Sequence, residues 1–172
     1  WAFVIILMLF ALLFRVNAIG APSLWADEGA SLAFAGMDWG TLWGVLPTVE
    51  TNPPLYYAIL KLWTGIAGTS EAMLRLPGAL AGALAAGAMF LAGHRFFGRG
   101  AGIIAGAVVA LSAVQVAHAQ EARAFAMVSA LVAVALWLIA VAVERIVQGR
   151  ARGGVLVALG LVLGLLPNIH YS

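Results

Sequence analysis

Long apolar runs separated by short charged stretches constrain this chain more than any other feature. A membrane-spanning helix needs ~20 mainly apolar residues. Five segments qualify or nearly do, namely residues 1–20, 76–93, 101–117, 124–143 and 153–169. Only 9% of the 172 residues are charged, whereas a soluble domain carries roughly 25%. The sequence therefore predicts an all-α fold, a polytopic transmembrane helix bundle with about five spans.

A sixth apolar stretch, residues 53–68, opens with two prolines and has Lys61 in its middle. If it does not span, all the basic loops between spans fall on one side of the membrane; they carry Arg95, Arg99, Arg145, Arg150 and Arg152. Short cytoplasmic loops hold the excess of Lys and Arg. Loop 21–75, with five acids against two bases, then faces outward. We therefore expect residues 53–68 to form an amphipathic helix at the outer interface.

Charge and cysteine content exclude several classes of function. The formal net charge of +2 is too small to indicate a nucleic-acid partner. The chain has no cysteine, which excludes a disulfide framework or a thiolate metal site within it. It begins inside an apolar run without Met and stops after another. We therefore expect residues 1–172 to be the N-terminal transmembrane part of a longer protein.

The first candidate site is the acidic pair Asp27-Glu28, directly after the first apolar run. Ser23 is placed to cap a short helix that ends near Gly36, since its hydroxyl can accept from a first-turn amide. Under this interpretation the acids only favour the helix dipole. Alternatively, a carboxylate at the membrane surface supplies a general base to a hydroxyl acceptor.

The second candidate lies between the third and fourth predicted spans, in the sequence His118-Ala119-Gln120-Glu121-Ala122-Arg123. On a helix, His118 and Glu121 would share a face because they are three residues apart. Ionisable residues at this depth usually face a cavity or a partner. The alternative is an ordinary loop whose charges are screened by water.

Two further groups of polar residues flank apolar runs. Glu50 precedes Asn52-Pro53-Pro54, where the prolines either stiffen a loop over a site or start a helix. His170 follows the fifth apolar run. It is either an interfacial side chain or, with Glu50 or His118, a ligand of a divalent cation.

Glycines four residues apart predict close helix packing. The pairs are Gly78 with Gly82, Gly102 with Gly106 and Gly160 with Gly164.

Six motifs occur in an order that resembles a known family: LWADEGAS, TNPPLYYAILKLW, SEAMLRLPGAL, HRFFGRGAG, AQEARAFAM and NIHYS. The chain resembles the bacterial branch of the dolichyl-phosphate-mannose protein mannosyltransferase family, a branch that includes the aminoarabinose transferases of lipid A. The resemblance runs from about residue 15 to residue 172.

The resemblance implies a GT-C type glycosyltransferase of the bacterial inner membrane. Such an enzyme moves a sugar from a polyprenyl-phosphate carrier to an acceptor hydroxyl or phosphate at the outer face. The acceptor is a protein, a lipid or a polysaccharide. No nucleotide cofactor is expected, because the polyprenyl phosphate is already an activated leaving group.

The resemblance also implies roles for particular residues. Asp27 would be the general base with Glu28 beside it, and Glu121 fits a second acidic position. Glu50 and His170 fit a divalent metal site of the aminoarabinose branch. That branch has Lys where this chain has Asn52, which argues against a specific assignment to lipid A.

Substrate contacts are expected from outer-side cations and aromatic side chains. Arg123 and Arg75 suit a phosphate, which a guanidinium can bind bidentately. Arg75 could equally be a helix-start arginine at the headgroup level. Tyr56 and Tyr171 are expected to line the substrate site.

Two other classes of function remain as alternatives. A transporter should show inverted repeats and ionisable residues at mid-membrane, whereas the charges of this chain gather near the ends of its apolar runs. A non-catalytic membrane scaffold would keep the spans without bringing Asp27, Glu50 and Glu121 together.

Overall fold

The computed structural model describes residues 1–49, 53–150 and 153–170, and within these ranges every regular element is a helix. The bounds are α1 Ala2–Val16, α2 Ala26–Gly36, α3 Trp39–Val49, α4 Leu55–Ala67, α5 Glu71–Phe97, α6 Arg99–Leu111, α7 Ala113–Ala119, α8 Phe125–Val147 and α9 Gly153–Ile169. The prediction of an all-helical fold is thus confirmed for the described residues.

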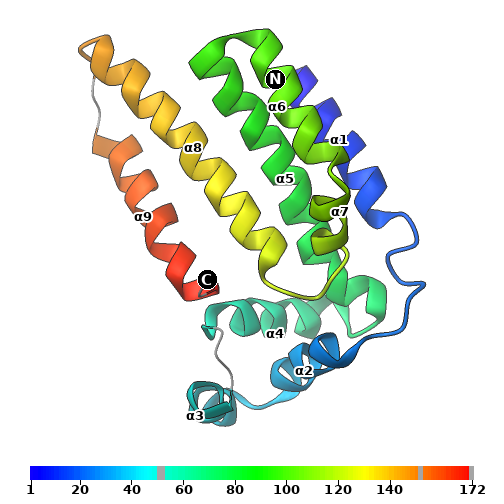
Figure 1. Cartoon of the computed structure of the whole chain (residues 1–172). Coiled ribbons are helices and arrows are strands. Elements are labelled where there is room, and N and C mark those ends of the chain that lie inside the picture. The colour runs from blue at the N-terminus through cyan, green and yellow to red at the C-terminus, as the bar shows by residue number, and fades with distance from the viewer. Residues whose placement is uncertain (50–52, 151–152, 171–172) are drawn as a thin grey trace.

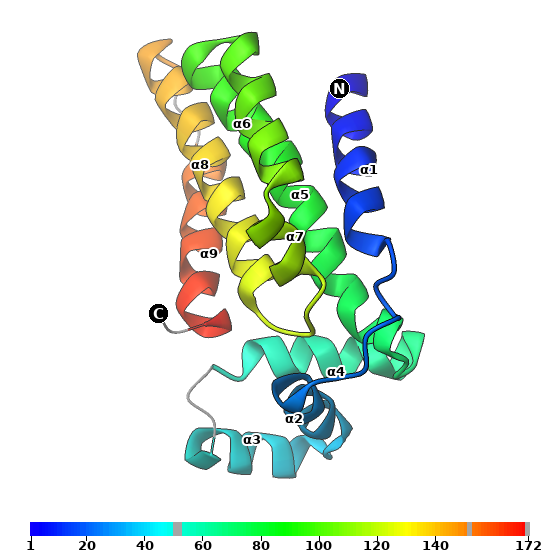
Figure 2. The ribbon, with the colours of Figure 1, turned by 45° about the vertical axis from the view of Figure 1, so that its right-hand side comes forward.

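The long helices form a bundle in which α5 packs against α1, α6 and α8, and α8 packs against α9 (Figures 1 and 2). Among the described residues, α5 and α8 are long and apolar enough to cross a membrane. The bent pair α6–α7 makes a third candidate. With 15 and 17 residues, α1 and α9 are shorter apolar helices, and counting them as spans stays a prediction.

Small residues allow the close packing of this bundle. A Cβ added to Gly78 would lie 2.9 Å from the Ala119 carbonyl oxygen, and one added to Gly102 would lie 2.7 Å from the Phe90 oxygen. At α5–α8, four buried alanines form a cluster of their own, Ala85, Ala88, Ala130 and Ala133. The predicted role of the first two glycine pairs is confirmed. Gly160 and Gly164 have nothing within 4 Å of such a Cβ.

The segment predicted as a span over residues 101–117 consists of two helices, a break that the sequence analysis did not predict. α6 and α7 meet at Ser112 with a bend of 55°. The Ser112 hydroxyl starts the new helix by accepting from the Gln115 amide at 3.4 Å. Arg15, fully buried, donates to the α6 carbonyls of Val109 at 2.9 Å and Ala110 at 3.1 Å. The backbone groups that the break leaves without helical partners therefore find hydrogen bonds inside the bundle.

The two ends of the bundle are built differently. At one end, Arg95 pairs with Glu144 at 2.6 Å, which brings the α5–α6 turn next to the end of α8. At the other end lie α2, α3 and α4, and Figure 1 shows α4 lying across the bundle rather than along it. This agrees with the prediction that residues 53–68 do not span.

The mid-helix Lys61 donates to the carbonyls of Ala35 and Met37 and so caps the end of α2.

Candidate functional site

The centre of the α2–α4 end is a buried ion pair between Glu28 and Arg75. Arg75 Nε donates to Glu28 Oε1 at 2.7 Å, and Nη2 donates to Oε2 at 2.6 Å. The Glu28 side chain is 1% exposed and the Arg75 side chain is 4% exposed. This bidentate geometry is the strong form of the Arg–carboxylate contact. It fastens the start of α2 to the first turns of α5.

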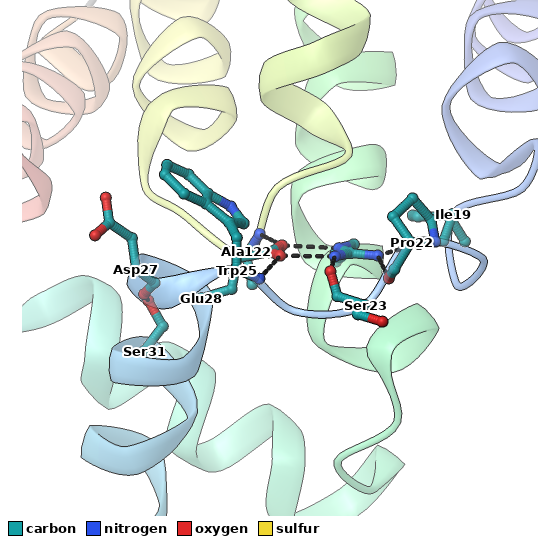
Figure 3. A network of polar contacts seen from close by, with 9 residues as sticks. Ile19, Pro22, Ser23, Trp25, Asp27, Glu28, Ser31 and Ala122 are labelled. Carbon is teal, nitrogen blue, oxygen red and sulfur yellow. Dashed lines mark hydrogen bonds and ion pairs between the residues drawn. The ribbon is translucent and has the colours of Figure 1, made fainter.

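Both partners make further hydrogen bonds, so neither charge is left unsatisfied. The Arg75 guanidinium also donates to the carbonyls of Ile19, Pro22 and Ser23. The Glu28 carboxylate accepts from the Ala122 amide at 2.8 Å (Figure 3). One buried carboxylate therefore joins the start of α2, α5 and the turn before α8.

Electrostatics keep Glu28 ionised. Burial by itself would raise the pKa of the Glu28 carboxyl, but hydrogen bonds from Arg75 and from the Ala122 amide, with the Arg75 charge, hold that pKa below its usual value. A carboxylate with a lowered pKa and saturated oxygens is a poor general base. The geometry gives Glu28 a positioning role, and its predicted catalytic role stays a prediction.

The Ser23 cap predicted from the sequence is wrong. α2 begins at Ala26 and its N-cap residue is Trp25. The cap is instead supplied from inside the helix, because the Glu28 carboxylate accepts from the Trp25 amide at 3.4 Å. Ser23 contributes its carbonyl oxygen to Arg75. The Glu28 side chain, in the first turn of α2, is thus held inward.

Asp27 points away from this pair. Figure 3 shows Asp27 and Glu28 leaving the first turn of α2 on different sides. The Asp27 carboxylate is 49% exposed and pairs with Arg123. The Arg123 guanidinium also lies 5.2 Å from the centre of the Phe125 ring and 5.9 Å from that of Trp25, both within cation–π range. The structure therefore brings together two predicted residues, Asp27 and Arg123, in a water-accessible position.

A narrow pocket lies beside Arg123. Its lining comes from α2, α4, the start of α8 and the end of α9: Ser31, Tyr56, Tyr57, Arg123, Ala124, Phe125 and His170. Its free volume of about 10 Å³ is room for one water molecule. Tyr56 is 4% exposed, and burial, with the charge of Glu28 adding to it, raises the pKa of its phenol well above the usual range. Tyr56 is therefore a neutral hydroxyl group in this wall.

Two histidines flank the Phe125 ring. The His118 and His170 rings lie 4.9 and 5.1 Å from it. His118 Nδ1 is 3.9 Å from Glu121 Oε2, so the predicted proximity is confirmed, although Glu121 follows the end of α7 rather than sharing its face. The Nδ1 atoms of both histidines are buried without a hydrogen-bond partner.

The predicted metal site is only partly within the described structure. Glu50 and Tyr171 lie outside the described residues. Among the residues that are described, no three His, Cys, Asp or Glu side chains come together as ligands. His170 offers one unpartnered nitrogen that could serve as a ligand. The divalent cation stays a prediction.

Some contributors to the site could not be found by looking for reactive side chains. The Ala122 amide binds Glu28 through the backbone, and Trp25 offers a ring to Arg123. Gln120, between the two spans, donates to the end of α1. The only sequence signal for them was their position next to the predicted acids.

Comparison with known proteins supplies the family. No curated protein and no solved structure matches the chain significantly. Residues 51–171 match the sequence profile described as dolichyl-phosphate-mannose-protein mannosyltransferase, which covers most of the chain, including α4 to α9 and the turn that carries Arg123. Its helical bundle and its apolar spans agree with a membrane glycosyltransferase. The chain belongs to the dolichyl-phosphate-mannose-protein mannosyltransferase family.

Proposed function

We propose that this protein transfers a sugar from a polyprenyl-phosphate carrier to an acceptor hydroxyl at the end of the bundle formed by α2 and α4. In a bacterial inner membrane, the charge distribution would place this end outside. The observation that carries the proposal is the pairing of Asp27 with Arg123 next to the narrow pocket that Phe125 helps to line. A base and a phosphate-binding cation thereby stand side by side.

The chemistry follows from these two groups. Asp27 accepts the proton of the acceptor hydroxyl while the acceptor oxygen forms a bond to the anomeric carbon. The bond from that carbon to the phosphate oxygen breaks, and the electron pair leaves with the polyprenyl phosphate. Arg123 binds the departing phosphate. Such a direct displacement inverts the anomeric centre.

The arrangement suggests how the base becomes available. Asp27 is paired with Arg123 as the chain stands, and a carboxylate paired with a cation is a weaker base. A donor phosphate competes for the same guanidinium and so releases the carboxylate. The sugar would lie at the pocket mouth, because the pocket itself has a free volume of only about 10 Å³.

The remaining predicted residues complete the proposal. Glu121, beside His118, is proposed as the second acid of the site. Tyr56 and Tyr171 are proposed to contact substrate. A divalent cation, held by Glu50 and His170, would supply additional charge for the phosphate. The acceptor is a protein, a lipid or a polysaccharide.

The test is transfer from a radiolabelled polyprenyl-phosphate hexose in membranes that contain the full-length protein. Asp27→Asn should lower turnover at least ~100-fold, the size expected for loss of a general base. Asp38→Asn is the matched control, because Asp38 lies in the same loop and only caps α3 through the Thr41 amide at 3.0 Å, a role that Asn keeps. Equal turnover in both variants would remove Asp27 from the mechanism. No transfer by the wild type from any of several carrier-linked sugars would overturn the proposed donor class.

A further inference from the structure

Gln120 joins the turn before α8 to the end of α1. Its Nε2 lies 3.0 Å from the Asn17 carbonyl oxygen, 3.2 Å from that of Arg15 and 3.4 Å from that of Phe14. α1 ends at Val16. Carbonyls in the last turn of a helix have no amide donor within the helix itself. The Gln120 side chain supplies donors to these carbonyls from more than 100 residues away.

α1 returns the same kind of contact. Arg15 donates through Nη1 and Nη2 to the last-turn carbonyls of Ala110 and Val109 in α6. The α6–α7 segment thus caps α1 through Gln120, and α1 caps α6 through Arg15. The side chain of Arg15 also lies against Gly82 of α5, where an added Cβ would come within 2.4 Å of Nε. The hydrogen bonds of Gln120 and of Arg15 thus fix the position of α1 relative to α6 and α7.

The residues directly after Gln120 belong to the candidate site. The Ala122 amide donates to Glu28 at 2.8 Å, and Arg123 pairs with Asp27. The short segment from Gln120 to Arg123 is therefore held on one side by α1 and on the other by α2. A shift of this segment would move the phosphate-binding guanidinium relative to the base.

We infer that Gln120 is a positioning residue of the transfer reaction. Together with Arg15 it forms what we call the clamp, the reciprocal hydrogen bonds that hold α1 against α6 and α7. This inference rests on the proposed function, since it assigns Gln120 the task of placing Arg123 beside Asp27. Gln120 acts through donated hydrogen bonds to three carbonyl oxygens. A side chain that keeps a donor should preserve this placement, and one that offers only acceptors should destroy it.

The first experiment compares Gln120→Glu with Gln120→Lys in the full-length protein. Glu is the same size as Gln, but it brings a negative charge to carbonyl oxygens at the negative end of a helix. It should lower kcat/KM for transfer about 10- to 100-fold, the scale expected for a small displacement of catalytic groups. Lys keeps a donor and a favourable charge, so its activity should stay within about threefold of the wild type.

Gln148→Glu is the matched control, because Gln148 lies at the other end of the bundle, where it makes an exposed contact with Glu144. This variant should leave transfer unchanged. If Gln120→Glu and Gln120→Lys both match the wild type, or if both lose activity equally, the donor role of Gln120 is refuted.

A second readout does not depend on transfer. The 172 residues contain no cysteine, and Ala122 is 1% exposed. Ala122→Cys is introduced into the full-length protein after any cysteine outside these 172 residues has been replaced. A water-soluble maleimide should then label the thiol slowly in this variant, with or without Gln120→Lys. Labelling should be at least ~10-fold faster in Gln120→Glu. Unchanged labelling in Gln120→Glu would overturn the clamp, whether or not any carrier-linked sugar is transferred. Faster labelling without transfer by the wild type would support the clamp and reject the proposed donor.

Discussion

Glu28 and Arg75 lie 47 residues apart in sequence, yet they share two hydrogen bonds of 2.7 and 2.6 Å inside the protein. Each also binds backbone groups from other segments. A buried ion pair is stabilising only when its charges keep such partners. The pair therefore organises the end of the bundle that carries Asp27 and Arg123, while Asp27 itself stays accessible.

Removing one partner of this pair should be costly. Glu28→Gln leaves the Arg75 charge buried without its counter-ion, and we expect a loss of about 3–5 kcal/mol in the free energy of unfolding. Glu144→Gln breaks an exposed pair with Arg95, whose side chains are 46% and 32% exposed, and should cost less than about 1 kcal/mol. Unfolding by SDS titration in mixed micelles measures both. Similar losses in the two variants would mean that burial of the Glu28 pair adds nothing.

The same carboxylate should make stability depend on acid. Its pKa is lowered in the folded protein, so its contribution is present above the unfolded-state pKa of about 4.3 and is lost as the pH falls through the lower folded-state value. The stability difference between wild type and Glu28→Gln should be constant from about pH 8 to about pH 5 and shrink at lower pH. Unfolding measured across this range tests the direction. A difference that grows as the pH falls would contradict the assignment.

Arg123 should affect transfer more than stability. Its pair with Asp27 is partly exposed, with side chains 22% and 49% accessible, so Arg123→Gln should change the free energy of unfolding by less than about 1 kcal/mol. The variant should raise the KM for the carrier-linked sugar and lower kcat, because the departing phosphate loses its cation. Steady-state kinetics on the purified full-length protein provide the check. A large loss in the free energy of unfolding with an unchanged KM would instead show that Arg123 has a structural role.

Two glycine substitutions should have different effects on stability. Gly78→Ala places a Cβ 2.9 Å from a backbone oxygen of Ala119, which must shift, and should destabilise by about 1–3 kcal/mol. Gly160→Ala meets nothing within 4 Å, so it should be neutral or stabilise by up to about 1 kcal/mol through helix propensity. Thermal unfolding in detergent separates them. A loss at Gly160 would show that this face of α9 is covered by another segment.

Much of the helical framework could be predicted from hydropathy alone. The predicted span 153–169 coincides with α9, and the prolines and Lys61 correctly marked residues 53–68 as different from the spans. Local patterns sufficed because apolar length and charge position are properties of the chain itself. The break at Ser112 was missed, since one serine in an apolar run is also common in unbroken membrane helices.

The site could be predicted only in part. The sequence placed Asp27, Arg123, His118 and Glu121 at one end, and the structure brings the first two together and the last two together. It could not separate Asp27 from Glu28, because adjacent residues on a first turn look alike until their partners are known. The partners of Glu28, Arg75 and the Ala122 amide, are distant in sequence and chemically ordinary.

The Glu28 contacts also imply an order of assembly during synthesis. A ribosome makes Glu28 first, then Arg75 47 residues later, and Ala122 94 residues after Glu28. At first the carboxylate therefore has only its local partner, the Trp25 amide. It gains its counter-ion when the start of α5 follows, and it gains the Ala122 amide only after α6 and α7 have been made. The end of the protein that holds α2 and α4 can therefore close only once the hairpin of α5 with α6–α7 has formed.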